Sequence, residues 1–95
     1  MTEAITPKLV QQEIDKACAI HGAKPEDVIF RLRYKANETP RTVAARIEAI
    51  EGIVCRTGAS GIKIADAWGC DDKFILPHYP DPARLAFLRG SQDGR

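Results

Sequence analysis

The sequence predicts an all-α domain of five to six helices, and three observations support this. Apolar residues recur at three- and four-residue spacing along most of the chain, which is the period of an amphipathic helix. Three times a capping side chain stands directly before proline, at Thr6-Pro7, Thr39-Pro40 and Asp81-Pro82. This pair is typical of a helix start, because the side chain caps the first amides and proline fits the first turn. No alternating run of useful length is present, so no strand is expected.

The first two helices are predicted in the N-terminal third of the chain. One is expected over 7–21, where Thr6 provides the cap and the apolar stripe ends before Gly22. Glycine suits the left-handed stop of a helix because it has no Cβ atom. A second, short helix is expected to begin at Pro25, because the acidic residues that follow suit the positive end of a helix dipole. Residues 34–38 are expected to form a loop.

The third predicted helix, about Pro40–Arg56, is the longest and is expected to form the centre of the fold. Gly52 weakens its interior by roughly 1 kcal/mol relative to alanine, and a small residue there permits a close helix crossing. Its apolar residues follow the spacing of a buried helix face. The stripe expected to face the core comprises Val43, Ala44, Ile47, Ile50 and Val54, widened by Ala45, Ala49 and Ile53.

A helix-turn-helix is predicted at about 61–79. Its first helix is expected to be capped by Ser60 and to end at Trp68-Gly69, where glycine takes the positive φ of a tight turn. One residue of Asp71-Asp72 is expected to cap the second helix, and Pro77 to stop it early. This geometry most often places the second helix in the major groove of DNA.

The last helix is expected to run from Asp81-Pro82 to Gly90, followed by a loose tail at 91–95. About two turns of helix are unstable alone in water, because nucleation is costly. The helix is therefore expected to dock, either back on its own core or on a second copy of the chain. Its apolar residues are Leu85, Phe87 and Leu88.

The composition is that of one small globular domain, ordered over about 6–90. The chain has 95 residues, of which 44% are hydrophobic and 28% charged, and its net charge is +1. It has no run of 18 apolar residues and no secretory signal pattern, so a cytoplasmic protein is expected. Cys18, Cys55 and Cys70 lack paired spacing, so reduced thiols are expected, with neither a metal site nor a cofactor. No glycine-rich phosphate loop or nucleophile elbow is present, so an enzyme is not expected.

Five segments carry a resemblance to a known family: IHGAKPEDVI (20–29), RLRYK (31–35), PRTVAARIEAI (40–50), RTGASGIKIADAWG (56–69) and Asp72. Together they resemble the C-terminal DNA-binding domain of the bacterial replication initiator DnaA, of the Trp-repressor-like helix-turn-helix group. The match covers about residues 10–76, and its most specific part is Thr-Gly-x-Ser-x-x-x-Ile-Ala-x-x-x-Gly at 57–69.

The resemblance implies a role for basic residues before and within the long helix. In the family they hold DNA phosphates, which here implies Arg31, Arg33, Lys35 and Arg46. The family opens its recognition helix with Asp-His-Thr-Thr, whereas this chain has Asp-Lys-Phe-Ile at 72–75. No ATPase region is present, so a small regulator or a phage-type protein of related fold is expected.

The sequence therefore supports two alternative functions. The first is a DNA-binding regulator of transcription or replication, with double-stranded DNA as partner. Its predicted contact residues are Arg31, Arg33, Lys35, Arg41, Arg46, Ser60, Lys63, Asp72 and Lys73.

The second is a protein-interaction module or inhibitor that keeps the helix-turn-helix as a scaffold. The acidic residues and the proline of the second helix favour it, because carboxylates repel a polyanion. The patch expected to bind a partner or a second copy comprises Phe74, Leu76, Tyr79, Leu85, Phe87 and Leu88.

Overall fold

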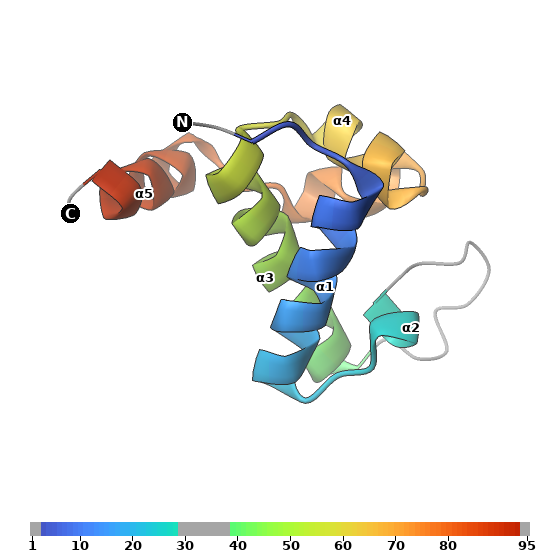
Figure 1. Ribbon diagram of the computed structural model, residues 1–95. Helices are drawn as coiled ribbons and strands as arrows, with labels where there is room; N and C mark the ends of the chain where they lie inside the picture. Colours follow the sequence, from blue (N-terminus) through green and yellow to red (C-terminus); the bar gives the residue numbers. More distant parts are fainter. Residues whose placement is uncertain (1–2, 29–38, 94–95) are drawn as a thin grey trace.

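The structure is built of helices packed around α3, and it confirms the predicted all-α fold. The computed structural model describes residues 3–28 and 39–93, and no strand occurs in these ranges. Figure 1 shows α1 and α3 side by side and antiparallel, with α4 across one end of the pair. In chain order the elements are α1 (Pro7–His21), α2 (Pro25–Val28), α3 (Pro40–Thr57), α4 (Gly61–Trp68), the 3₁₀ turns η1 (Asp72–Phe74) and η2 (Leu76–His78), and α5 (Pro82–Asp93).

The predicted starts and stops of α1, α3 and α4 are confirmed, except that α3 ends at Thr57, one residue later than expected. Each helix begins at a hydroxyl that accepts a hydrogen bond from the backbone N–H three residues on, which satisfies one of the amides that have no partner inside the helix. The pairs are Thr6 and Leu9 (3.1 Å), Thr39 and Thr42 (3.2 Å), and Ser60 and Lys63 (3.4 Å). Each helix ends at a left-handed glycine, namely Gly22, Gly58 and Gly69.

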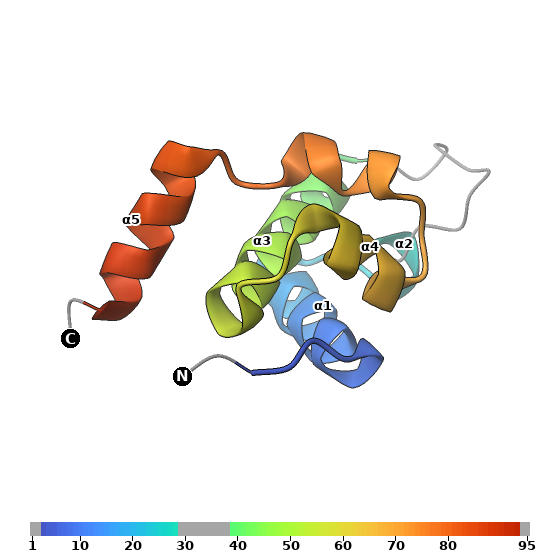
Figure 2. The same cartoon turned by 90° about the horizontal axis from the view of Figure 1, so that it is seen from above.

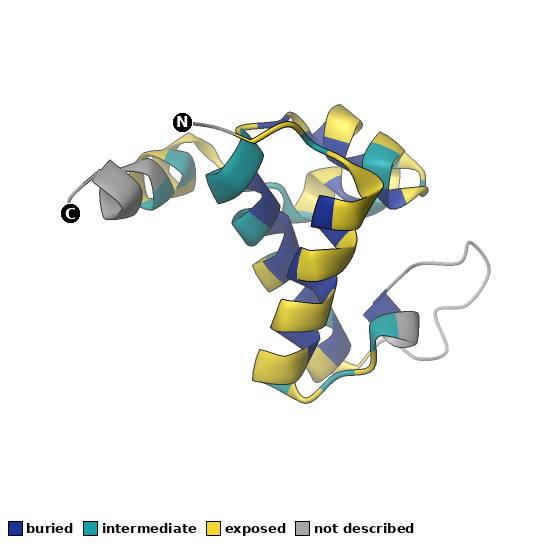
Figure 3. Cartoon of the chain, viewed as in Figure 1, coloured by how far each residue is buried: buried dark blue, intermediate teal, exposed yellow. Residues whose placement is uncertain are grey.

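The core lies between α1 and α3 and continues beneath α4. Figure 3 shows buried residues on the facing sides of α1 and α3. The predicted α3 stripe is confirmed in part: Val43, Ala44 and Ile47 are only half-buried, whereas its other five residues are buried, namely Ala45, Ala49, Ile50, Ile53 and Val54. Fully buried alanines at 45 and 49 let a neighbouring helix approach closely, so the helix turns their side inward. The observed stripe is Thr42, Ala45, Arg46, Ala49, Ile50, Ile53 and Val54.

The second helix, predicted to begin after Asp71 or Asp72 and to be stopped early by Pro77, is not a continuous α-helix. Asp71 caps it as expected, since its carboxylate accepts a hydrogen bond from the Lys73 backbone N–H (3.1 Å). Two 3₁₀ turns then follow, with Ile75 between them and only 1% exposed. Pro77 explains the break, because proline has no N–H and its ring clashes with the carbonyl four residues earlier. The Tyr79 hydroxyl donates a hydrogen bond to the Ala59 carbonyl (2.8 Å) and holds the end of this segment.

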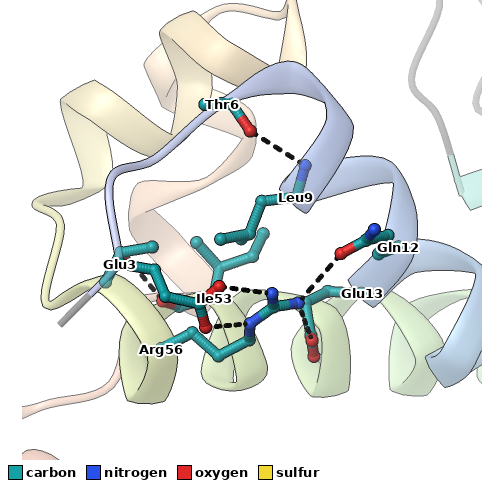
Figure 4. A network of polar contacts seen from close by, with 8 residues as sticks. Glu3, Thr6, Leu9, Gln12, Glu13, Ile53 and Arg56 are labelled. Atoms are coloured by element: carbon teal, nitrogen blue, oxygen red, sulfur yellow. Dashed lines mark hydrogen bonds and ion pairs between the residues drawn. The ribbon is translucent and has the colours of Figure 1, made fainter. Parts of the chain in front are cut away.

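A polar cluster joins the N-terminal arm to the helix pair (Figure 4). The Arg56 guanidinium donates hydrogen bonds to the Glu3 carboxylate (2.7 and 2.8 Å) and to the Glu13 carboxylate (3.0 Å). Gln12 accepts a longer bond from it (3.3 Å). Glu13 is 5% exposed. A buried carboxylate is costly without a cation, so Arg56 lets Glu13 lie inside the fold.

The arm contact is expected to be released in acid. The hydrogen bond from Arg56 lowers the pKa of Glu3 below its usual 4.5. Because the pKa of Glu3 is lower in the folded than in the unfolded state, the contact stabilises the fold above about pH 4.5. This stabilisation is lost as the pH falls through the folded-state pKa. An NMR titration of the Glu3 carboxyl should show the lowered pKa in the wild type and its return toward 4.5 in Arg56→Gln. Equal Glu3 titrations in the two proteins would contradict this assignment.

The last helix, α5 (Pro82–Asp93), is longer than expected, and only its first turns contact the rest of the fold. It runs to Asp93 rather than stopping at Gly90. Asp81 accepts a hydrogen bond from the Arg84 backbone N–H (2.8 Å), which confirms the predicted cap. The Arg84 guanidinium donates two bonds to Glu51 on α3 (2.8 and 3.0 Å). Beyond these first turns α5 leaves the bundle, as Figure 2 shows.

Candidate nucleic-acid interface

The predicted DNA-contact residues fall into three groups. Arg31, Arg33 and Lys35 lie outside the described residues. Arg46 lies in the core, at 2% exposure. The remaining five lie outside the core, at the start of α3 or around α4 and η1: Arg41, Ser60, Lys63, Asp72 and Lys73.

The position of Arg46 differs from the prediction. The sequence predicts its guanidinium on a DNA-facing surface, whereas the structure buries it. It occupies the buried stripe of α3, four residues after Thr42 and four before Ile50. Its charge acts on Cys70, whose pKa burial raises to about 11 while the Arg46 charge opposes that rise. A side chain with 2% exposure does not reach a phosphate in this conformation, so Arg46 belongs to the interior of the fold.

The structure brings Lys63 and Asp72 together at a hollow between α4 and the turn that follows it. The hollow has a volume of about 310 Å³ and is lined by Ile62, Lys63, Ala65, Asp66, Cys70 and Asp72. Lys73 follows Asp72 in η1 and is exposed, with its ammonium 5.3 Å from the centroid of the Phe74 ring. One lysine of α4 therefore lines the hollow, and a second lies next to Asp72 in the chain.

Carboxylates share this face with the two lysines. Asp66, Asp71 and Asp72 all lie on α4 or at the start of η1. The hydrogen bond from the Lys73 backbone N–H lowers the pKa of Asp71, so this group is charged at neutral pH. Three carboxylates against two ammonium groups leave the hollow itself unsuited to a polyanion. Any phosphate contact on this side therefore lies at the lysines along its edge.

A second set of cations lies near the N-terminal end of α3. Arg41 and Lys24 are exposed, and Arg41 Nη1 is 3.9 Å from the position that a Cβ atom on Gly22 would take. Neither forms an ion pair with another described residue, whereas Arg56 and Arg84 are bound to carboxylates. The sequence between Val28 and Thr39 adds three more cations to this part of the chain.

Ser60 and Lys63 also border a larger hollow on the other side of α4. It has a volume of about 600 Å³ between the N-terminal arm and the connection from α3 to α4. The Ser60 hydroxyl oxygen accepts the capping hydrogen bond of α4, and the residue is exposed. Lys63 lies between the two hollows and is the most central exposed cation of this region.

No three His, Cys, Asp or Glu side chains among the described residues gather in a way that would hold a metal ion. No described helix combines the length and the apolar character needed to cross a bilayer.

Comparison with family models, with curated proteins and with solved structures found no match to this chain. The resemblance to the initiator's DNA-binding domain therefore stays a prediction from the quoted segments.

Proposed function

We propose that this chain is a small DNA-binding regulator that holds the phosphate backbone with exposed cations. The observation that carries the proposal is the position of Lys63 and Lys73. Both are exposed, and neither forms an ion pair with another described residue. Lys63 lines the hollow together with Asp72, and Lys73 follows Asp72 in η1. Phosphate contacts of this kind fix a protein on DNA without reading its sequence.

Base reading by the second helix is not part of the proposal. A base-reading helix presents several side chains along the major groove, whereas η1 and η2 each comprise three residues. Of the side chains on this segment, Lys73 alone is a good base reader. The inferred binding is therefore electrostatic and tolerant of sequence. The basic segment at 31–35, with Arg41 beside it in sequence, supplies further cations.

The double variant Lys63→Ala/Lys73→Ala tests this interface. Each lost phosphate contact should reduce the magnitude of the negative slope of log affinity against log salt by about one unit. The slope of the double variant should therefore be about two units less steep than that of the wild type. Fluorescence anisotropy with a random-sequence duplex, at roughly 50 to 200 mM salt, measures the slope.

Lys8→Ala/Lys16→Ala is the matched control, because it removes two exposed lysines from α1. Its slope should equal that of the wild type. If the slope became less steep by the same amount in both double variants, or in neither, Lys63 and Lys73 would not belong to the interface.

A protein-interaction module is the second candidate, and a specific observation favours it. Ile62 is 63% exposed and lines a hollow together with Asp66 and Asp72. Leu76 is 47% exposed and its side chain lies against Gly61, at the start of the same helix. An apolar and acidic surface suits a protein partner better than DNA. The two functions respond oppositely to Asp66→Lys, which should strengthen DNA binding by adding a cation and should weaken an acidic docking surface.

A further inference from the structure

The guanidinium of Arg56 binds its two carboxylates on different edges. Its Nε and Nη2 atoms donate to the two oxygens of Glu3 (2.8 and 2.7 Å). Its Nη1 atom donates to Glu13 and Gln12 (3.0 and 3.3 Å), on the other side of the group in Figure 4. Two parallel bonds from one guanidinium edge are the geometry in which arginine holds either a carboxylate or a phosphate. The edge formed by Nε and Nη2 is therefore suited to an anion of either kind.

The buried Glu13 carboxylate does not keep a second anion away from Arg56. Glu13 is 5% exposed and is bound to Nη1. The Glu3 carboxylate nevertheless lies on the Nε and Nη2 edge, and the hydrogen bond from Arg56 lowers the pKa of Glu3. The charged form of Glu3 is thus favoured there with Glu13 in place. Another anion of similar size meets the same surroundings when Glu3 moves away.

Glu3 is the more easily displaced of the two carboxylates. Its side chain is 54% exposed, whereas that of Glu13 is 7% exposed. An exposed ion pair stabilises a fold by only up to about 1 kcal/mol, because water and salt screen it. The arm has anchors besides this carboxylate, since the Glu3 backbone N–H donates to the Arg56 carbonyl (2.8 Å) and Ile5 packs against the core. Rotation of the Glu3 side chain into solvent therefore opens the guanidinium edge while the arm stays in place.

Glu3 also borders the hollow of about 600 Å³ that Lys63 lines. The arm contributes residues 3–5 to this hollow, and the connection from α3 to α4 contributes residues 57–60. Arg56 directly precedes that connection and binds the Glu3 side chain. The edge that Glu3 covers is therefore linked through one residue to the hollow of a lysine already assigned to phosphate contact.

We propose that the Nε and Nη2 edge of Arg56 is a phosphate site, and that Glu3 occupies it from within the chain. Where the phosphate belongs to DNA, the inference rests on the proposed function and adds Arg56 to its backbone contacts. Glu3 is then an autoinhibitory group, because its carboxylate competes with DNA for the same two N–H donors. A free phosphate group offers the same oxygens, so the experiment has one part for each source.

Glu3→Ala tests the DNA source, because it removes the internal anion and keeps the backbone anchor. With Arg56 open to a phosphate, the negative slope of log affinity against log salt should become about one unit steeper, so a fourfold rise in salt should cost the variant about 3.5 times more affinity than the wild type. Anisotropy with a random-sequence duplex measures both chains. Asp15→Ala is the matched control, since Asp15 is an exposed acidic residue of α1 with no ion pair to another described residue. Its slope should equal that of the wild type.

Inorganic phosphate tests the site without DNA. In Glu3→Ala the NMR signal of the Arg56 Nε–H should shift and saturate as phosphate replaces chloride at constant ionic strength, whereas the wild type should respond more weakly because Glu3 competes. This shift without a steeper DNA slope assigns the site to free phosphate. Equal responses of the two chains, or none, overturn the proposal, and DNA binding by the wild type would then show that the lysine interface stands without Arg56.

Discussion

Arg46→Ala is expected to destabilise the fold by about 2–4 kcal/mol. Arg46 is the largest fully buried side chain of the described residues, at 2% exposure. Truncation removes the volume of this side chain from the buried stripe of α3 and leaves a cavity in the core. Urea unfolding followed by circular dichroism measures the loss.

Two neighbouring substitutions make this test specific. Arg41→Ala removes an exposed arginine one and a half turns earlier on the same helix and should change stability by no more than about 0.5 kcal/mol. Arg46→Met keeps most of the volume without the charge, and should cost less than Arg46→Ala because buried charges are often replaced at little cost. Equal effects of Arg46→Ala and Arg41→Ala would show that Arg46 is a surface residue.

Gly52→Ala is the second large effect expected, a loss of about 1–2 kcal/mol in unfolding free energy. A Cβ atom at Gly52 would collide with the Glu13 carboxylate. That carboxylate is buried and held by Arg56 (3.0 Å), so it has little room to yield. The collision outweighs the roughly 1 kcal/mol that alanine gains over glycine inside a helix.

The Glu13→Ala background isolates this collision. Without the carboxylate, Gly52→Ala should become stabilising by up to about 1 kcal/mol, because only the helix propensity remains. The sign of the Gly52→Ala effect in the two backgrounds, read from denaturant midpoints, is the measurement. A stabilising Gly52→Ala in the wild-type background would mean that Glu13 does not pack against Gly52.

The parts of this fold that follow from local chemistry are predictable from the sequence. The hydroxyl caps at Thr6, Thr39 and Ser60 and the glycine stops after α1 and α4 need only neighbouring residues, and all are confirmed. Pro77 indicates a break in the second helix, yet proline alone does not show that only two 3₁₀ turns form. That outcome depends on Ile75 being drawn into the core.

The burial of charged groups cannot be predicted in the same way. Arginine is seldom fully buried, so the sequence alone favours a surface position for Arg46. The phase of the α3 stripe is ambiguous because alanines occur at 44, 45 and 49, and only packing against other helices selects one side. The burial of Glu13 depends on a partner 43 residues away, Arg56, and no local pattern indicates such a pairing. Arg46, one of the predicted DNA contacts, is among these residues, so the proposed interface has fewer cations than the sequence predicts.

The central claim is that exposed cations bind DNA through its phosphates without reading bases. Anisotropy titrations of the wild-type chain against two duplexes of unrelated sequence, at several salt concentrations, test it directly. The account predicts affinities within about threefold of each other. It also predicts a log–log salt slope between roughly −2, from Lys63 and Lys73 alone, and roughly −5, from all six proposed cations at about −0.9 each. A slope near zero, no binding at low salt, or a strong preference for one duplex would contradict it.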